Sequence, residues 1–421
     1  MAQPETVHRP EGHNNDMENT NLQHVFIIGC KGIPAAYGGF ETFADKLAAC
    51  QSDSRIRYHV ACAAEPEDYD KTHRHYRYCH ASCTVFPWRR IGAGRAIVYD
   101  LEALAYFIRY AEKKQIPHPI FYILACRIGP WAGYFEKKIH SIGGKLYVNP
   151  DGHEFLRAKW SVPVRRYWKY SEGLMVRHAD LLVCDSRHIR SYIRSEYQAY
   201  HPDTEFIAYG ADITPSPISD GDQALREWYG RHGIERGNYY LAVARFVPEN
   251  NYGTMIREFM RAQTDKKLVF ITDAKGSFYE ELKAQTHFER DARICFAGTV
   301  YDQALLKKIR ENAYGSLHGH EVGGTNPSLL EALASTDLNL LFDVGFNREV
   351  ARGSACYWTK EPGSLAGLIE EADAMPDAQI AAYGKRAKDR IKKYYSWEYI
   401  TKEYESLFCR YNRRNDICVE L

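Results

Sequence analysis

No segment of this chain has the length and apolarity of a membrane-spanning helix. Such a helix needs about 18 or more consecutive apolar residues. The longest candidate, residues 91–111, is interrupted by charged side chains, namely Arg95, Asp100, Glu102 and Arg109. Residues 1–22 are polar and lack the apolar centre of a signal peptide, so their composition predicts a disordered tail.

The sequence also lacks a large charge of either sign. Its 55 Lys and Arg residues nearly balance its 54 Asp and Glu residues, which leaves a net charge of +1. Proteins that bind nucleic acids by neutralising phosphates need an excess of basic residues. We therefore expect no nucleic-acid partner.

A metal-binding spacing is missing as well. The 11 cysteines are an odd number, and many lie in apolar segments, which is typical of reduced thiols in a cytosolic protein. Cys79 and Cys83 have His75 and His80 nearby, but a second ligand pair at zinc-site spacing is absent. We expect no metal and no other cofactor.

The dinucleotide-binding pattern GxGxxG is absent from the first strand–loop–helix unit. Val25 to Ile28 read as a buried strand, and the loop after it ends in Gly38 and Gly39, at the entrance of a helix with Glu41 in its first turn. The glycine spacing differs from GxGxxG, and no acidic residue stands out at the end of a second strand. A nicotinamide cofactor is therefore unexpected.

What the sequence does contain is a second glycine pair, in the segment HGHEVGGTNPSLLEALA at 318–334. Gly323 and Gly324 follow a short strand pattern and let a backbone pass close to a ligand. Asn326 suits a helix N-cap and Pro327 the first helical position. A strand, a glycine loop and a helix N-terminus form an anion site, because free N–H groups and the positive end of the helix dipole meet there.

Two carboxylates flank this anion site. Glu321 precedes the glycines, and Glu331 lies one turn into the predicted helix. Carboxylates do not help to bind phosphate, but they accept hydrogen bonds from sugar hydroxyls. A ligand with phosphates and sugars is a nucleotide-sugar. The pattern alone also fits an ordinary glycine-rich turn with two solvated glutamates.

Strand and helix patterns alternate along the chain and predict an α/β fold of two Rossmann-like domains facing across a cleft. We expect an acceptor-side domain at 23–212 and a nucleotide-sugar-binding domain at 238–396. Residues 213–237 lose the apolar runs and carry prolines and glycines, which predicts a linker. Residues 397–421 predict a C-terminal helix that can cross back to the first domain.

A polar cluster follows the predicted strand at 145–148. Ligands bind at the carboxyl ends of strands in open α/β sheets, and Asp151, His153 and Glu154 stand at this end. An ordinary turn accounts for Asn, Pro, Asp and Gly at 149–152. It does not account for His153, Glu154 and Arg157, which favour a functional role.

Basic and aromatic residues interleave between Arg157 and Arg177. A helix face of this kind suits an anionic lipid surface, and an ordinary solvated face looks much the same. We expect a weak membrane-surface association through it. The residues are Lys159, Trp160, Arg165, Arg166, Trp168 and Lys169.

These segments resemble the GT-B glycosyltransferases of family 4, and most closely the bacterial rhamnosyltransferases of capsule and exopolysaccharide biosynthesis. The similarity covers both domains and is carried by IIGCKGIPAAYGGFETFADKL, NPDGHEFLRAKW, VARFVPENN, FAGTVYDQALLKKIRENAYGSLHGHEVGGTNPSLLEAL and DVGFNREV. It implies metal-free, retaining transfer of a sugar from a nucleotide diphosphate. For the rhamnosyltransferase branch it implies dTDP-L-rhamnose as donor, a lipid-diphosphate-linked glycan as acceptor, and a cytoplasmic enzyme at the inner face of the cell membrane.

The resemblance also implies residue roles. Arg245 and the loop before the helix would hold the donor diphosphate, and Asp151 or His153 would orient the acceptor hydroxyl or the donor sugar. The acceptor would enter over Gly38 and Gly39. The loop residues are Gly323, Gly324, Thr325 and Asn326.

Two positions depart from the family pattern. The family has seven residues between its two glutamates, whereas nine lie between Glu321 and Glu331. Glu331 therefore takes the ribose-binding position, and Glu321 reaches the donor sugar only if the loop bulges. The family's diphosphate-binding lysine is replaced by Asn250, which leaves more of the leaving-group charge to Arg245.

Three other functions stay open at this point. The chain could use another nucleotide-hexose, with glucose, mannose or galactose as the donor sugar. It could be a nucleotide-sugar epimerase or hydrolase of GT-B architecture, or a non-catalytic sugar-nucleotide sensor. Fold alone does not separate them, and the clustered Asp151, His153, Glu321 and Glu331 argue against the sensor.

Overall fold

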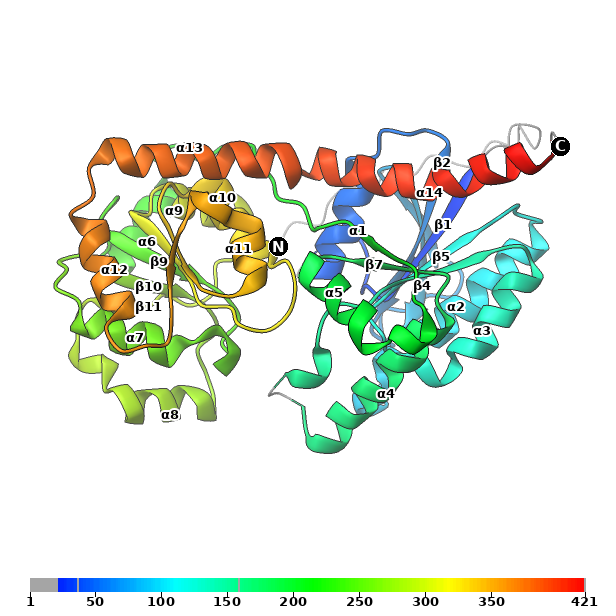
Figure 1. Cartoon of the computed structure of the whole chain (residues 1–421), viewed down its shortest axis with the longest axis horizontal. Helices are drawn as coiled ribbons and strands as arrows, with labels where there is room; N and C mark the ends of the chain where they lie inside the picture. Colours follow the sequence, from blue (N-terminus) through cyan, green and yellow to red (C-terminus); the bar gives the residue numbers. More distant parts are fainter. Residues whose placement is uncertain (1–21, 36–37, 158–159, 420–421) are drawn as a thin grey trace.

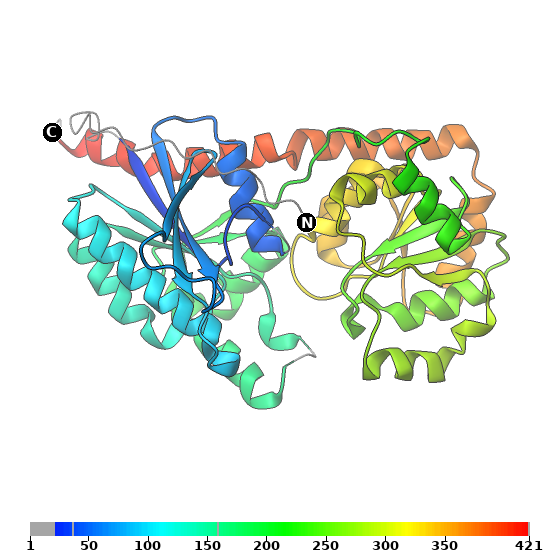
Figure 2. The ribbon, with the colours of Figure 1, turned by 180° about the vertical axis from the view of Figure 1, so that it is seen from behind.

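The computed structural model describes residues 22–35, 38–157 and 160–419. The expected tail at 1–22 therefore lies almost wholly outside the described residues, as does Lys159 of the basic and aromatic segment. Two sheets lie side by side, each covered by helices, which confirms the expected pair of α/β domains (Figures 1 and 2).

The first domain is built on an eight-stranded sheet in the order β3-β4-β2-β1-β5-β6-β7-β8. Neighbouring strands pair in parallel except β3 and β4, whose antiparallel pairing was not expected from the sequence. The strands are β1 (Gln23–Ile28), β2 (Ile56–Ala64), β3 (His75–Tyr78), β4 (Ala81–Pro87), β5 (Ile120–Leu124), β6 (Lys145–Asn149), β7 (Leu181–Cys184) and β8 (Thr204–Phe206). The helices are α1 (Gly39–Ala49), α2 (Arg95–Lys113), α3 (Gly129–Ser141), α4 (Val162–His178) and α5 (Arg187–Glu196).

The second domain is built on a parallel six-stranded sheet in the order β11-β10-β9-β12-β13-β14. Its strands are β9 (Tyr239–Val243), β10 (Lys267–Ile271), β11 (Ile294–Phe296), β12 (Gly315–His318), β13 (Asn339–Phe342) and β14 (Cys356–Trp358). The helices are α6 (Gln223–His232), α7 (Tyr252–Arg261), α8 (Ser277–Thr286), α9 (Gln303–Glu311), α10 (Pro327–Ser335), α11 (Gly345–Ala351) and α12 (Ser364–Asp373). The chain ends in α13 (Asp377–Tyr394) and α14 (Trp397–Val419).

Burial explains why the strands could be recognised from sequence. All residues of β1 and β5 are buried, because central parallel strands are covered by helices on both faces. The segment at 213–237 differs from the expected linker. It contains α6, whose Leu225 and Trp228 pack with Tyr239 and Leu241 of β9, so this part of the segment belongs to the second core.

The last two helices run along one side of both domains (Figure 1). In α14, Tyr404 and Phe408 are buried in the same apolar cluster as Val25 and Tyr58 of the first sheet. The Tyr404 and Tyr122 hydroxyls are 3.1 Å apart. The C-terminal helix therefore crosses back and completes the core of the first domain. No helix among the residues described has the length and apolarity to cross a membrane.

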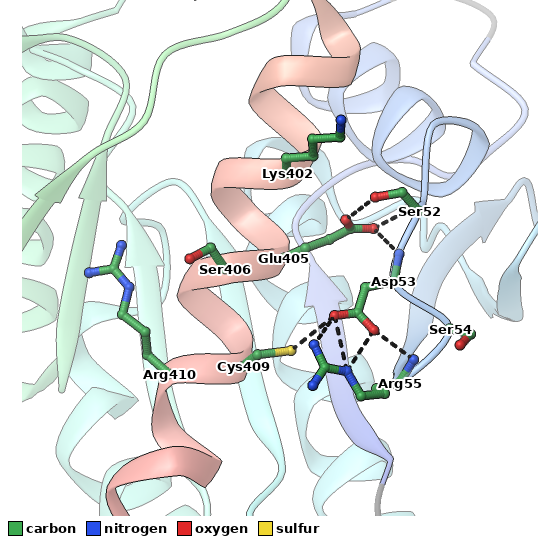
Figure 3. A pocket seen from close by; sticks show the side chains of 9 residues that line it. All are labelled: Ser52, Asp53, Ser54, Arg55, Lys402, Glu405, Ser406, Cys409 and Arg410. Carbon is green, nitrogen blue, oxygen red and sulfur yellow. Dashed lines mark hydrogen bonds and ion pairs between the residues drawn. The ribbon is translucent and has the colours of Figure 1, made fainter.

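A buried carboxylate fixes α14 to the loop before β2. Glu405 accepts hydrogen bonds from the backbone N–H of Ser52 (2.6 Å), the Ser52 hydroxyl (2.6 Å) and the backbone N–H of Asp53 (3.0 Å) (Figure 3). These groups lie in a polar pocket of about 520 Å³. Its lining residues are Ser52, Asp53, Ser54, Arg55, Lys402, Glu405, Ser406, Cys409 and Arg410.

We expect Glu405→Ala to lower the free energy of unfolding by roughly 1.5–3 kcal/mol, the range of a hydrogen bond to a charged group. Urea unfolding followed by tryptophan fluorescence would measure it. Glu398→Ala is the matched control, because Glu398 is exposed in the first turn of the same helix. Equal stability of the two variants would show that the Ser52–Glu405 contact does not hold α14 in place.

Candidate functional site

The predicted helix entrance is confirmed at the start of α10. Asn326 is the N-cap, its side-chain oxygen accepts from the backbone N–H of Ser328 (2.8 Å), and Pro327 is the first helical residue. The Ser328 hydroxyl donates to the carbonyl of Val243 at the end of β9 (2.6 Å). The helix N-terminus is therefore fixed at the carboxyl edge of the second sheet, and free N–H groups at such a position can bind an anion.

The two glycines before this helix meet different requirements. Gly323 has a φ of 128°, which side chains of L-residues rarely tolerate. A Cβ on Gly324 would lie 2.1 Å from Oδ1 of Asp185, at the end of β7 in the other domain. The next residue, Thr325, donates its hydroxyl to the carbonyl of Asp185 (2.5 Å). This loop therefore packs directly against the first domain.

The Asp151–Arg157 loop of the first domain reaches the same place. A Cβ on Gly152 would be 3.6 Å from the backbone nitrogen of Gly324. Asp151 (φ 60°) and His153 (φ 50°) both have left-handed backbone conformations, which are uncommon outside glycine and cluster at functional sites. The structure thus brings the 151–157 cluster and the 323–326 loop together, although they are far apart in sequence.

Charges in this first-domain loop are arranged around Arg157. Its guanidinium forms an ion pair with Glu154 and lies 3.8 Å from Asp151. Burial raises the pKa of Asp151, and Arg157 gives the largest opposing effect. Burial also lowers the pKa of His153 to about 4, helped by His188 and Lys169. His153 is therefore neutral at pH 7 and can act as a hydrogen-bonding group, not as a cation.

Arg245 supplies a cation from the second domain. It follows β9 closely and is exposed, and no ion pair joins it to a carboxylate among the residues described. Its positive charge lowers the pKa of Asp151 in the first domain and of His320 in the second. Arg245 is available to an anionic ligand.

Both polar atoms of the Asn250 side chain have hydrogen-bond partners. Its amide donates to the carbonyl of Arg245 (2.7 Å), and its oxygen is 2.9 Å from Nδ1 of His320. Burial lowers the pKa of His320 well below its usual value, so this histidine is neutral. Asn250 therefore fixes the turn that carries Arg245 instead of pointing at a ligand.

The two glutamates of the opening motif lie in different environments. Glu321 forms an ion pair with Lys360 (2.6 Å) and accepts from Nδ2 of Asn251 (3.1 Å). Glu331 forms an ion pair with the buried Arg310 of α9 (2.7 Å), and 38% of its side chain is exposed. Arg310 orients the carboxylate of Glu331, which is still open to solvent. A carboxylate that binds a ribose needs both properties.

Gly38 and Gly39 stand at the start of α1, as predicted. Gly38 has a φ of 128°, and a Cβ there would meet the carboxylate of Glu41 at 1.9 Å. A Cβ on Gly39 would meet nothing within 4 Å, so space is open beside this helix start. Residues 36 and 37 lie outside the described chain.

Sequence reasoning missed three charged residues around this site. Arg127 follows β5 and donates to Asp100 of α2 (3.0 Å) and to the carbonyl of Gly29 (3.0 Å). Asp185 directly follows β7, and Glu349 accepts from the backbone N–H of Arg187 (3.0 Å). A charged residue just after a buried parallel strand was the available signal for Arg127 and Asp185.

Asp185 is the least favourably placed of these groups for stability. It is 4% exposed, and its Oδ1 has no hydrogen-bond partner. Burial raises its pKa well above the usual value, the nearby Asp151 and Glu349 raise it further, and the backbone N–H of Thr325 opposes this only in part. A buried acid beside two other acids is typical of a functional site. Among the described residues, no group of three or more His, Cys, Asp or Glu side chains is arranged to hold a metal ion.

A family model described as a domain of unknown function (DUF1972) matches residues 22–212, which is less than half of the chain. A search of curated proteins found no match.

Solved structures match nearly the whole chain. Sucrose-phosphate synthase from Thermosynechococcus elongatus is 15% identical, with a TM-score of 0.73 over 93% of this chain and 100% of the other. The E. coli trehalose-6-phosphate protein bound with UDP-2-fluoro glucose is 12% identical, with a TM-score of 0.69 over 92% and 99%. Anabaena HepE in complex with UDP is 14% identical, with a TM-score of 0.64 over 92% and 100%. These neighbours are GT-B glycosyltransferases, and the chain has the GT-B fold.

We expect Asp185→Asn to keep or increase stability at pH 7–8. The folded state raises the pKa of this acid, so stability is lost as pH rises from the unfolded pKa of about 3.9 towards the folded one. The amide removes that loss while it preserves the shape of the side chain. Thermal unfolding between pH 5 and 8 would measure it, with Asp203→Asn as the exposed control. A variant less stable than the parent at pH 8 would contradict the raised pKa.

Proposed function

We propose that this chain is a metal-independent, retaining glycosyltransferase of family 4 that moves L-rhamnose from dTDP-L-rhamnose onto a lipid-diphosphate-linked glycan. The observation that carries the proposal is the meeting of Arg245 and the 323–326 loop with the 151–157 loop in a GT-B fold. Two of the structural neighbours are bound to UDP or a UDP-sugar analogue, which supports a nucleotide-sugar donor.

In this proposal the second domain binds the nucleotide. The donor diphosphate lies at the N-terminus of α10, against the backbone N–H groups of residues 323–326, and Arg245 pairs with its charge. Stabilising the departing diphosphate lowers the barrier for a step in which positive charge develops on the sugar. Because the side chain of Asn250 is hydrogen-bonded within the protein, Arg245 and the backbone N–H groups stabilise the departing diphosphate.

The first domain orients the sugar and the acceptor. His153, neutral at pH 7, and Asp151 hydrogen-bond hydroxyls of the donor sugar or the acceptor. Asp185, beside Gly324 and close to Asp151, adds a further carboxyl group that can hydrogen-bond a hydroxyl. The acceptor enters over Gly38 and Gly39, where space is open beside α1. The first domain spans residues 23–212, the second runs from α6 to α13, and α14 returns to the first.

The resemblance to rhamnosyltransferases supports the choice of rhamnose. Another nucleotide-hexose is the second candidate, because the neighbour bound with UDP-2-fluoro glucose shares the fold. Incubation with dTDP-rhamnose, with and without a lipid-diphosphate-linked acceptor, tests the main proposal. Formation of a rhamnosylated lipid only in the presence of acceptor supports it. Transfer from UDP-glucose alone would favour the second candidate, and acceptor-independent release of sugar would favour a hydrolase.

We expect Arg245→Ala to lower kcat by roughly 10²-fold or more, the effect of removing a group that stabilises the transition state. The rate of transfer, measured in the presence of EDTA, is the readout. Arg257→Ala on α7 is the control, because it changes the net charge by the same amount as Arg245→Ala. Activity of Arg245→Ala within a few-fold of the parent would exclude its role at the diphosphate, and loss of activity with EDTA that a metal restores would exclude metal-independent transfer.

The two glutamates should separate nucleotide binding from sugar binding. Glu331→Gln is expected to weaken dTDP and dTDP-rhamnose alike, by roughly the 1.5–3 kcal/mol of a charged hydrogen bond, because both ligands carry the same ribose. Glu321→Gln should leave dTDP affinity unchanged and weaken dTDP-rhamnose or lower kcat. Calorimetric titration of both ligands measures this. Parental binding and turnover in Glu321→Gln would show that Glu321 serves only its ion pair with Lys360.

A peripheral membrane position is part of the same proposal, since the acceptor is a lipid. The α4 segment offers less free charge for it than the sequence suggested. Lys169 pairs with Glu196 (2.7 Å) and lies over the rings of Phe155, Tyr192 and Tyr197. Arg165 donates to the carbonyl of Phe155 (2.8 Å), while Arg166 is exposed.

A further inference from the structure

A second pocket lies on the first domain, between α2, α3 and the loop before β3. It has a volume of about 670 Å³, and none of its residues takes part in the contacts between the two domains described above. It is lined by Tyr69, Lys71, Arg74, Phe86, Pro87, Arg89, Leu101, Glu102, Ala105, Tyr106, Arg109, Trp131, Tyr134 and Phe135. The lining therefore joins basic groups to aromatic rings.

The charge of this pocket is strongly positive. The carboxylate of Glu102 is already paired with Arg89 (2.8 Å). Arg74 lies 4.2 Å from the centre of the Tyr106 ring, which holds its guanidinium at the wall. Lys71 and Arg109 are exposed and have no ion-pair partner among the residues that the structure describes. Cations without partners in a pocket with a single, neutralised carboxylate select an anionic ligand.

The other half of the lining is apolar and partly open to solvent. Trp131 is 42% exposed and Tyr134 is 60% exposed, and both line the pocket from α3. Tryptophan and tyrosine of this kind are enriched at membrane–water interfaces, because their rings are apolar and their polar atoms stay hydrated. A ligand that matches this lining has an anionic group next to an apolar part.

The part of the chain that contains α3 is rich in exposed apolar side chains. Among the described residues, eleven large hydrophobic side chains are exposed. Six of these eleven lie between residues 91 and 170. Within that part α3 packs on α4. The six are Ile91, Trp131, Tyr134, Leu156, Val162 and Tyr170. Of these six, Trp131 and Tyr134 line the pocket.

We propose that the pocket between α2 and α3 binds the phosphate headgroup of an anionic phospholipid and docks the first domain on a membrane surface. Lys71, Arg74 and Arg109 contact the headgroup phosphate, and Trp131 and Tyr134 enter the interfacial layer beside it. This site differs from the α4 segment, and its occupancy does not depend on the transferase reaction.

Vesicle co-sedimentation of the full chain tests the proposal. We expect binding to vesicles of phosphatidylglycerol and phosphatidylcholine, and none to phosphatidylcholine alone. Lys71→Glu with Arg109→Glu should weaken binding at least about tenfold, since each basic residue near an anionic surface contributes about 1 kcal/mol. Trp131→Ala with Tyr134→Ala should also weaken it, because the rings supply apolar contact. Circular dichroism confirms that each variant is folded.

The matched control is Lys137→Glu with Lys138→Glu, which changes the net charge equally on exposed positions of α3 outside the pocket. Parental vesicle binding by this control, with loss in the pocket variant, supports the proposal. Equal loss in both would show attraction by net charge alone and overturn it, as would parental binding by the pocket variant. Binding of inorganic phosphate to the parent protein without any binding to the vesicles would instead assign the pocket to a free phosphate ligand.

Discussion

The contact between Thr325 and Asp185 sets the relation between the two halves of the site. It brings the glycine loop of the second domain against the carboxyl edge of the first sheet, and only glycine at 324 leaves room for it. The Asp151–Arg157 loop then lies beside that glycine loop, and the charge of Arg245 reaches Asp151. The residues assigned to the proposed site therefore come from both domains.

This arrangement is unfavourable for stability taken by itself. Asp151, Asp185 and Glu349 all have raised pKa values because they are buried. Buried acids that are not fully paired destabilise a fold, and a ligand with many hydroxyls would give them partners. Asp151 and His153 also have left-handed backbone conformations, which are unfavourable for residues other than glycine. The surrounding packing maintains them. In the proposed function, a bound ligand would therefore offset a local loss of stability.

Local patterns in the sequence were sufficient for most of the fold. The buried strands, the cap at Asn326 with Pro327, and the glycine entrance at Gly38 could be read because each depends on neighbouring residues. The α6 helix was hidden among prolines and glycines that resemble a linker. The partners of Glu321, Glu331 and Asn250 could not be read, because Lys360, Arg310 and His320 approach them only through tertiary packing. Asp185 was missed because its environment comes from the other domain.

The two crossings between the domains have a mechanical consequence. The chain passes from the first domain to the second near Gly210 and returns between α13 and α14, and the two passages touch. Ala211 pairs with Ser396 as an isolated bridge and donates to the carbonyl of Tyr395 (2.7 Å), while a Cβ on Gly210 would collide with the Trp397 ring. Two adjacent covalent connections act as a single hinge line. Two linked crossings restrain sliding and twisting of one domain against the other more than they restrain rotation about this line.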